Sequence, residues 1–344
     1  MSFYIIKLHI LFEVDEKEMR SKEILKLRKK ISQINRDLQL TLFVQDFFIM
    51  KNEVLIKSQP DCLTEDCFSS IARSKKYNVK LNDFDTDFSK SREFTFESTF
   101  VFTYSIFEDY LLSLFKFIKK IRTGSQTNSI VNPNSQEGNP EKKCNTILLS
   151  LSNYLFPERD CEDQRCFDQN IIDTNDYIRK RRNHIVHDRK KQTKSLAELI
   201  SSKGVLLNQY WSEIRRNKKK KRFSNINFAK PIMHKVVQKK NGREANKGKK
   251  EAKMIKEKMD EAEMVEILVL IRELSSIIDK NVLEALDKDT IIAHVLEKYK
   301  TKKKYIFEDP NQEKRFKNKF IKYAEEQYNI KSHEIMEYMK FQYD

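Results

Sequence analysis

One stretch of the chain is apolar around most of a helical circumference, and this feature restricts the fold more than any other. Phe, Leu, Ile and Val dominate between residues 93 and 121, where Tyr104, Glu108 and Asp109 are the polar exceptions. A helix that is apolar on nearly every side has to be covered by other elements or by a partner chain. The stretch therefore predicts a long helix that is central to a bundle or covered by a partner chain.

The composition of the whole chain also favours helices. Only 5 Gly and 6 Pro occur among 344 residues, whereas 34% of the residues are charged and 39% are hydrophobic. Few turn-forming residues argue against turn-rich sheets. We expect an all-α protein, long enough for two or three domains with their own cores.

The N-terminal part of the chain predicts a helix followed by a connector. Apolar residues recur at intervals of three and four between Ile24 and Leu38, which indicates a helix over about residues 16 to 42. The apolar stretch from 40 to 56 either continues this helix or turns back on it. Residues 3 to 14 fit a strand or a buried helix, and residues 58 to 93 favour an irregular connector.

A basic stretch from Tyr177 to Arg189 predicts the helix that holds the most reactive side chains. Asp173 or Thr174 can cap its start, because such side chains accept hydrogen bonds from the first free amides. We expect this helix to run to about Lys191. A closing helix should follow from about residue 195 to 214.

Three residues in this stretch, Arg182, Asn183 and His187, suit the cleavage of RNA without a metal. On a continuous helix Asn183 and His187 project from one face, and Arg182 lies about 140° around from His187, so the cation, the amide and the imidazole can converge on one phosphate. An imidazole can take a proton from a ribose 2′-hydroxyl near neutral pH. A guanidinium can stabilise the extra negative charge of the transition state, and an amide can hold either group in place.

The residues from Arg182 to His187, which read R-N-H-I-V-H, resemble the R-N-x-x-x-H motif of the HEPN ribonucleases. Residues 100 to 115 are similar to the aromatic, acid-bearing first long helix of many HEPN domains. The resemblance covers about residues 90 to 212. It implies a HEPN-like bundle of four or five helices, to which this chain adds helical segments at both ends.

The resemblance also implies a function, which is metal-independent endoribonuclease activity without a cofactor. The ribose 2′-oxygen would attack the adjacent phosphate and leave a 2′,3′-cyclic phosphate and a 5′-hydroxyl. His187 would move the proton, Arg182 would stabilise the charge, and Asn183 would orient. A homodimer with two motifs in one cleft is implied as well, as is a role as a toxin or anti-phage effector with an inhibitor or defence-system partner.

Two neighbouring residues invite functional interpretations that we do not prefer. His184 stands at a variable position of the motif, so we interpret it as a surface or packing histidine. Glu108 could orient the arginine or the histidine, but a structural hydrogen bond or a charge at the edge of the packed face is the preferred interpretation. Glu108 is therefore not among the predicted catalytic residues.

Positive charge is concentrated after the predicted nuclease. Between Arg215 and Lys258 there are 18 Lys or Arg against 3 Glu, whereas residues 97 to 200 hold 16 basic and 14 acidic residues. Such a run attracts polyanions, and RNA is favoured over a membrane surface because the run lacks a sustained apolar face. A solvated linker without a ligand fits equally well. The predicted RNA-binding residues are Arg179, Arg181, Lys218, Lys219, Lys220, Lys221 and Arg222.

The C-terminal third has helical periodicity again. An apolar stripe predicts a helix over about residues 251 to 286, and a second helix follows at about 289 to 300. Asp309 and Pro310 provide the cap and first residue of a third helix, and the last covers about 332 to 343. We expect a small helical domain that could restrain the nuclease.

The chain is thus expected to contain four parts. These are a helical extension with its connector (1–89), the HEPN-like domain (90–214), a basic linker (215–250) and a C-terminal helical domain (251–344). The N-terminal apolar run lacks a basic leader, so we expect no signal peptide, no membrane span and a cytoplasmic location.

The cysteines predict a reducing compartment and no metal site. There are five of them, and the pairs Cys62/Cys67 and Cys161/Cys166 lack the short spacing typical of zinc knuckles. We therefore expect free thiols.

Two other functions fit the same residues. A HEPN-like domain without catalysis could bind RNA or a nucleotide together with a partner protein. A DNA-acting accessory of a restriction system would instead prefer duplex DNA. Cleavage of RNA in the presence of EDTA separates these possibilities.

Overall fold

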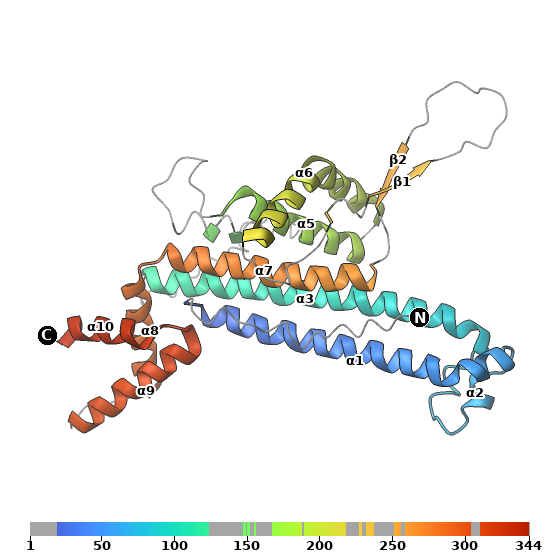
Figure 1. Ribbon diagram of the computed structural model, residues 1–344, viewed down its shortest axis with the longest axis horizontal. Coiled ribbons are helices and arrows are strands. Elements are labelled where there is room, and N and C mark those ends of the chain that lie inside the picture. Colours follow the sequence, from blue (N-terminus) through green and yellow to red (C-terminus); the bar gives the residue numbers. More distant parts are fainter. Residues whose placement is uncertain are drawn as a thin grey trace.

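A computed structural model describes most of the chain. The described residues are 19–123, 147–148, 150–151, 155, 167–187, 189–217, 227–228, 232–236, 251–255, 259–303 and 310–343. These residues are mostly helical, as the composition predicts. Long helices α1, α3 and α7 run alongside one another, with α5 and α6 on one side of α3 and α7 and with α1 on the other (Figure 1).

Helix α1 (Lys22–Ser58) is continuous, so the apolar stretch after residue 40 extends the first predicted helix and does not turn back. The Ser21 hydroxyl accepts a hydrogen bond from the Ile24 amide at 3.2 Å, which satisfies one of the free donors at the start of a helix. The predicted stripe is buried against α3 from Ile24 to Leu42. Residues 1–18 lie outside the described part.

The predicted connector is more ordered than its composition suggested. It holds α2 (Thr64–Cys67) and a 3-10 helix, η2 (Leu81–Asp83), and α3 (Phe84–Thr123) already begins within it. The ring centroids of Phe84 and Phe88 lie 5.6 and 5.7 Å from that of Phe48 on α1. This aromatic packing explains the early start of α3, because it fixes the first turn of that helix against α1.

A disulfide joins Cys62 and Cys67 at this end of the molecule, which corrects the prediction of free thiols at the two positions. The short helix α2 turns the chain so that its last residue, Cys67, approaches Cys62. The other cysteines lie outside the described residues. Within the described part, no group of three or more His, Cys, Asp or Glu side chains is placed to hold a metal ion.

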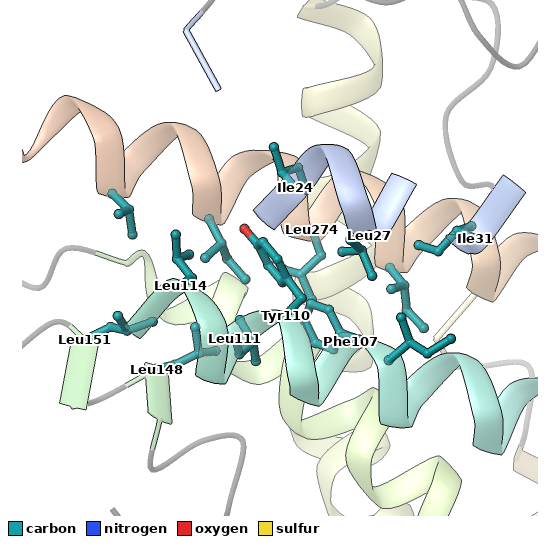
Figure 2. Packing of buried hydrophobic residues seen from close by; sticks show 14 of the residues in the cluster. Ile24, Leu27, Ile31, Phe107, Tyr110, Leu111, Leu114, Leu148, Leu151 and Leu274 are labelled. Carbon is teal, nitrogen blue, oxygen red and sulfur yellow. The ribbon is translucent and has the colours of Figure 1, made fainter. Parts of the chain in front are cut away.

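The hydrophobic core follows α3, which is buried on several sides as predicted. Leucines and aromatic residues of α3 meet the α1 stripe on one side and Leu274 of α7 on another (Figure 2). Leu148 and Leu151, which precede α5 in the chain, also reach this core. Helix α7, which was expected in a separate C-terminal domain, therefore shares one core with the central helices.

A buried polar cluster joins α1, α3 and α7 inside this core. The Ser21 amide donates to the Asp279 carboxylate at 2.9 Å, and the Ser21 hydroxyl donates to the same group. The Tyr110 hydroxyl lies 3.4 Å from the carboxylate. Burial raises the pKa of Asp279 to about 6, although these hydrogen bonds from Ser21 and the charge of Arg28 favour its ionised form.

Asp279 makes the stability of the fold depend on pH. Because its pKa rises from 3.8 to about 6 on folding, the folded protein binds this proton more tightly than the unfolded chain. The resulting stabilisation is complete below the unfolded pKa and is lost as the pH rises through the folded pKa. We expect the free energy of unfolding to fall by about 1 kcal/mol between pH 5 and pH 7.

Urea denaturation of wild type and of Asp279→Asn at both pH values measures this effect. Burial lowers the pKa of His294, which acts in the opposite direction, so the informative quantity is the difference between the two proteins. Asp289→Asn, at an exposed position of α8, should keep the wild-type pH dependence. A difference between wild type and Asp279→Asn that does not change with pH would contradict the raised pKa.

A two-stranded ribbon departs from the helical pattern. Strands β1 (Ile232–Val236) and β2 (Glu251–Ile255) pair antiparallel, with Ile232 opposite Ile255. The first strand lies in the predicted basic linker. The second takes residues that were predicted to begin the helix over 251 to 286.

Helix α7 (Glu261–Glu284) therefore starts later than predicted. The Asp260 side chain caps it by accepting a hydrogen bond from the Glu263 amide at 2.7 Å. Helix α7 starts late because the apolar stripe in the sequence begins only at Met264. The lysine-rich residues before it offer no apolar face that a helix could bury.

The C-terminal helices lie together at one end of the long helices (Figure 1). They are α8 (Lys288–Lys303), α9 (Pro310–Tyr328) and α10 (Ser332–Tyr343). Pro310 opens α9 as predicted, whereas Asp309 lies outside the described residues. Among the described helices, none combines the length and the apolar character needed to cross a membrane.

Candidate active site at the C-terminal end of α5

Helix α5 (Gln169–Val186) places the three predicted catalytic residues at its C-terminal end. Its cap is Asp168, whose side chain accepts from the Asn170 amide at 2.8 Å. The predicted caps were Asp173 or Thr174, and both lie inside the helix instead. Thr174 is buried, and its hydroxyl accepts a hydrogen bond from the Trp211 indole at 2.9 Å.

The helix ends within the motif, which corrects its predicted extension to about Lys191. His187 is the C-terminal cap and has an extended backbone, with φ −106° and ψ −175°. Its amide still donates to the Asn183 carbonyl at 2.9 Å. The next helix, α6 (Arg189–Asn217), begins almost at once.

The three side chains meet at this end of α5. Nη1 of Arg182 donates to Oδ1 of Asn183 at 3.0 Å and lies 3.4 Å from Nε2 of His187. Positions 182 and 187 lie about 140° apart around a helix axis, and the two side chains span this angle.

The three residues differ in their access to solvent. Asn183 is buried, Arg182 is half-buried, and His187 is exposed. The Arg182 guanidinium carbon lies 5.8 Å from the centre of the Tyr104 ring of α3, a distance at which the cation is attracted to the ring face. The arginine is therefore held from two sides while the histidine remains accessible.

The contact between Arg182 and His187 places a cation beside an imidazole. A guanidinium has only donors, and an imidazole whose Nε2 carries a lone pair can act as a general base.

Two of the predicted RNA-binding arginines are engaged within the fold. Arg181 has no exposed surface, and its guanidinium binds Glu263 of α7 with Nε–Oε1 and Nη2–Oε2 distances of 2.8 and 3.1 Å. Arg181 is therefore a packing residue, which corrects its assignment to RNA binding. Arg179 is half-buried and pairs with Asp176 at 2.6 Å. Lys218 to Arg222 lie outside the described residues.

The two residues left out of the catalytic set have structural surroundings. His184 is buried on the inner side of α5, in keeping with the packing interpretation. Glu108 is half-buried on α3. Neither residue is joined by a described hydrogen bond to Arg182, Asn183 or His187.

Two residues that support the site were not among the predicted functional residues. Tyr104 had been noted only as a polar exception in the apolar stretch, and Glu263 only as part of a helical segment. The sequence signal for Tyr104 was its hydroxyl within a helix expected to be central. No local signal identifies Glu263, because its partner lies in a different helix far away in the chain.

Comparisons with protein-family models, with curated proteins and with solved structures find no match for this chain. The interpretation of the site therefore rests on its geometry and on the chemistry of its side chains.

Proposed function

We propose that this chain is a metal-independent endoribonuclease with a HEPN-like active site formed by Arg182, Asn183 and His187. The observation that carries the proposal is the convergence of these side chains at the exposed end of α5, with Nη1 of Arg182 lying 3.4 Å from Nε2 of His187. A cation and a base at this separation can act on one phosphodiester.

The proposed reaction needs only groups that the chain supplies. Nε2 of His187 takes the proton of the ribose 2′-hydroxyl, and the 2′-oxygen forms a bond to phosphorus. The bond between phosphorus and the 5′-oxygen breaks, and a proton is returned to the leaving oxygen. The Arg182 guanidinium, held in place beside His187, donates to the phosphoryl oxygens, where its charge counteracts the added negative charge.

Asn183 has an orienting role in this scheme. Its buried amide oxygen accepts from Nη1 of Arg182, so it fixes the direction from which the guanidinium faces the phosphate. The ring of Tyr104 supports the other side of the same group. A fixed cation is more effective than a mobile one, because no reorganisation is needed in the transition state.

A second copy of the chain would complete this active site. A single histidine has to serve first as base and then as acid, whereas two motifs in a shared cleft supply one histidine for each step. The proposal therefore includes a homodimer around the motif.

The basic residues after α6 would attract the RNA backbone. The setting that the resemblance of the motif implies is a toxin or anti-phage effector, restrained by an inhibitor or a defence-system partner.

The proposal is tested with the full-length protein, RNA and EDTA. We expect cleavage that EDTA does not reduce, with 2′,3′-cyclic phosphate and 5′-hydroxyl ends detected by mass spectrometry. An RNA with 2′-deoxyribose at the cleaved linkage should resist cleavage, because the nucleophile is missing.

The result of this assay also decides between the alternatives. Binding of RNA without cleavage would contradict the enzyme and favour a binding module. Cleavage that needs a divalent cation, or cleavage of duplex DNA in preference to RNA, would contradict the mechanism.

A further inference from the structure

The C-terminal half of α1 carries a second apolar face that is open to solvent. Six of its side chains are between 48% and 81% exposed. They are Leu40, Phe43, Val44, Phe47, Met50 and Val54. At roughly 100 Å² for each side chain, they form a patch of about 600 Å², the upper size of the largest patch on a typical monomer.

The spacing of these residues is that of a coiled coil. Leu40, Phe43, Phe47, Met50 and Val54 follow one another at alternating intervals of three and four, which are the a and d positions of a heptad. We call these five residues the α1 seam. At 100° per residue, the α1 seam lies roughly opposite the face that buries Leu38 and Leu42 against α3.

The same side of α1 is polar in its N-terminal half. Lys26, Lys29, Gln33 and Arg36 are exposed there, and the apolar residues begin at Leu40. A helix side that only faces solvent would remain polar throughout. The change at residue 40 therefore marks a local contact surface and not a general property of this helix.

We propose that the α1 seam binds the α1 seam of a second copy of the chain as a short parallel coiled coil. A heptad seam fits a helix with the same repeat, and α1 itself provides such a helix. The contact is isologous, so it closes as a dimer. Each copy would bury its own apolar patch. The two patches together reach the lower end of the area expected of a specific interface.

The charges beside the α1 seam favour the parallel orientation. Asp46 and Lys51 occupy g and e positions, so each Asp46 faces Lys51 of the other copy in a parallel pair. In an antiparallel pair that matches a and d layers, Asp46 faces an acidic residue, either Asp46 or Glu53. Asp46 contacts Arg92 of its own chain, yet 65% of its side chain is exposed and accessible.

The charged residues also argue against a membrane as the occupant. A helix that lies on an anionic membrane has a polar face rich in Lys and Arg. Both signs flank the α1 seam instead, with Asp37, Asp46 and Glu53 beside Lys51 and Lys57. Paired helices use such mixed charges to fix their partner and register.

This surface is separate from the proposed active site. Helix α1 lies on the opposite side of α3 and α7 from α5 (Figure 1). A dimer through the α1 seam therefore leaves both motifs accessible, and it adds a second self-association surface to the one proposed around the motif. The inference does not depend on nuclease activity.

Sedimentation velocity of the full chain over a concentration series tests the proposal. We expect wild type to associate, and we expect Phe43→Glu with Phe47→Glu to halve its mass. Two buried, unpaired charges on each copy, four in the paired interface, should raise the dissociation constant at least about 100-fold. Val205→Glu replaces an equally exposed apolar residue on α6 and should leave the mass unchanged.

A cysteine at the end of the α1 seam tests the orientation. Val54→Cys should form an intermolecular disulfide in a parallel pair, where the two positions face each other. In antiparallel registers they are roughly 15 Å or more apart. Wild type and Val205→Cys control for the native cysteines.

Each outcome decides the proposal independently of the enzyme. The proposal is overturned if the wild-type chain stays monomeric, because another segment or partner would then cover the α1 seam. Association that is unchanged in the double Glu variant overturns it as well. This variant and wild type should cleave RNA at the same rate. If neither protein cleaves RNA, that result would count against the proposed function alone.

Discussion

We expect His187→Ala to lower the rate of RNA cleavage at least about a hundredfold, because a positioned general base contributes about 10²- to 10⁴-fold. Arg182→Lys should have a comparable effect, although it keeps the charge. Nη1 of Arg182 contacts both Asn183 and His187, and a lysine ammonium cannot reproduce the planar fork of donors that the guanidinium presents to a phosphate. Both rates are measured as single-turnover cleavage of a labelled RNA in EDTA.

Matched variants separate chemistry from general damage. His333→Ala and Arg315→Ala remove the same side-chain types from exposed positions of α10 and α9, and both should cleave at the wild-type rate. Circular dichroism and thermal unfolding should agree among all variants, since His187 is exposed. Cleavage by His187→Ala at the wild-type rate would exclude this histidine as the base.

The helical class and the central position of α3 could be predicted from the sequence, because both depend on local composition and periodicity. Prediction was weaker at element ends. Helix α3 begins early because Phe84 and Phe88 pack on Phe48, and that contact exists only once α1 is placed beside α3. The ribbon of β1 and β2 likewise depends on pairing between segments that are separated in the chain.

The convergence of the three candidate residues was predicted from the sequence, but the end of their helix was not. A continuous helix was expected from the basic stretch, with Arg182 about 140° around from His187. The chain leaves α5 at His187, and no proline or glycine marks this end in the sequence. Distances between the three side chains had to come from the structure, whereas their chemical types were the signal in the sequence.

Burial of individual charges is the property that the sequence showed least. Arg179, Arg181 and Arg182 are neighbours in one basic stretch, and each was expected to face RNA or phosphate. The structure gives them different partners, which are Asp176, Glu263 and the motif residues. Which side of α5 faces the core depends on α7, and α7 comes from a distant part of the chain.

The pair of Arg181 and Glu263 leads to the largest expected effect on stability. Glu263→Gln removes the negative charge without changing the shape, so the buried Arg181 guanidinium loses the countercharge of Glu263. Breaking a buried ion pair on one side costs about 3 to 5 kcal/mol. We expect a loss of about 3 kcal/mol in the free energy of unfolding, since Gln can still accept one hydrogen bond. Urea denaturation at constant pH measures it.

Two further variants show whether the buried charge is the cause. Glu261→Gln alters an exposed residue in the same turn of α7 and should change stability by less than about 0.5 kcal/mol. Arg181→Met with Glu263→Leu removes both charges, so most of the loss should be recovered. Because Arg181 adjoins Arg182, the single variant should also speed hydrogen exchange at the end of α5. A single variant as stable as wild type would show that Arg181 is not held by this pair.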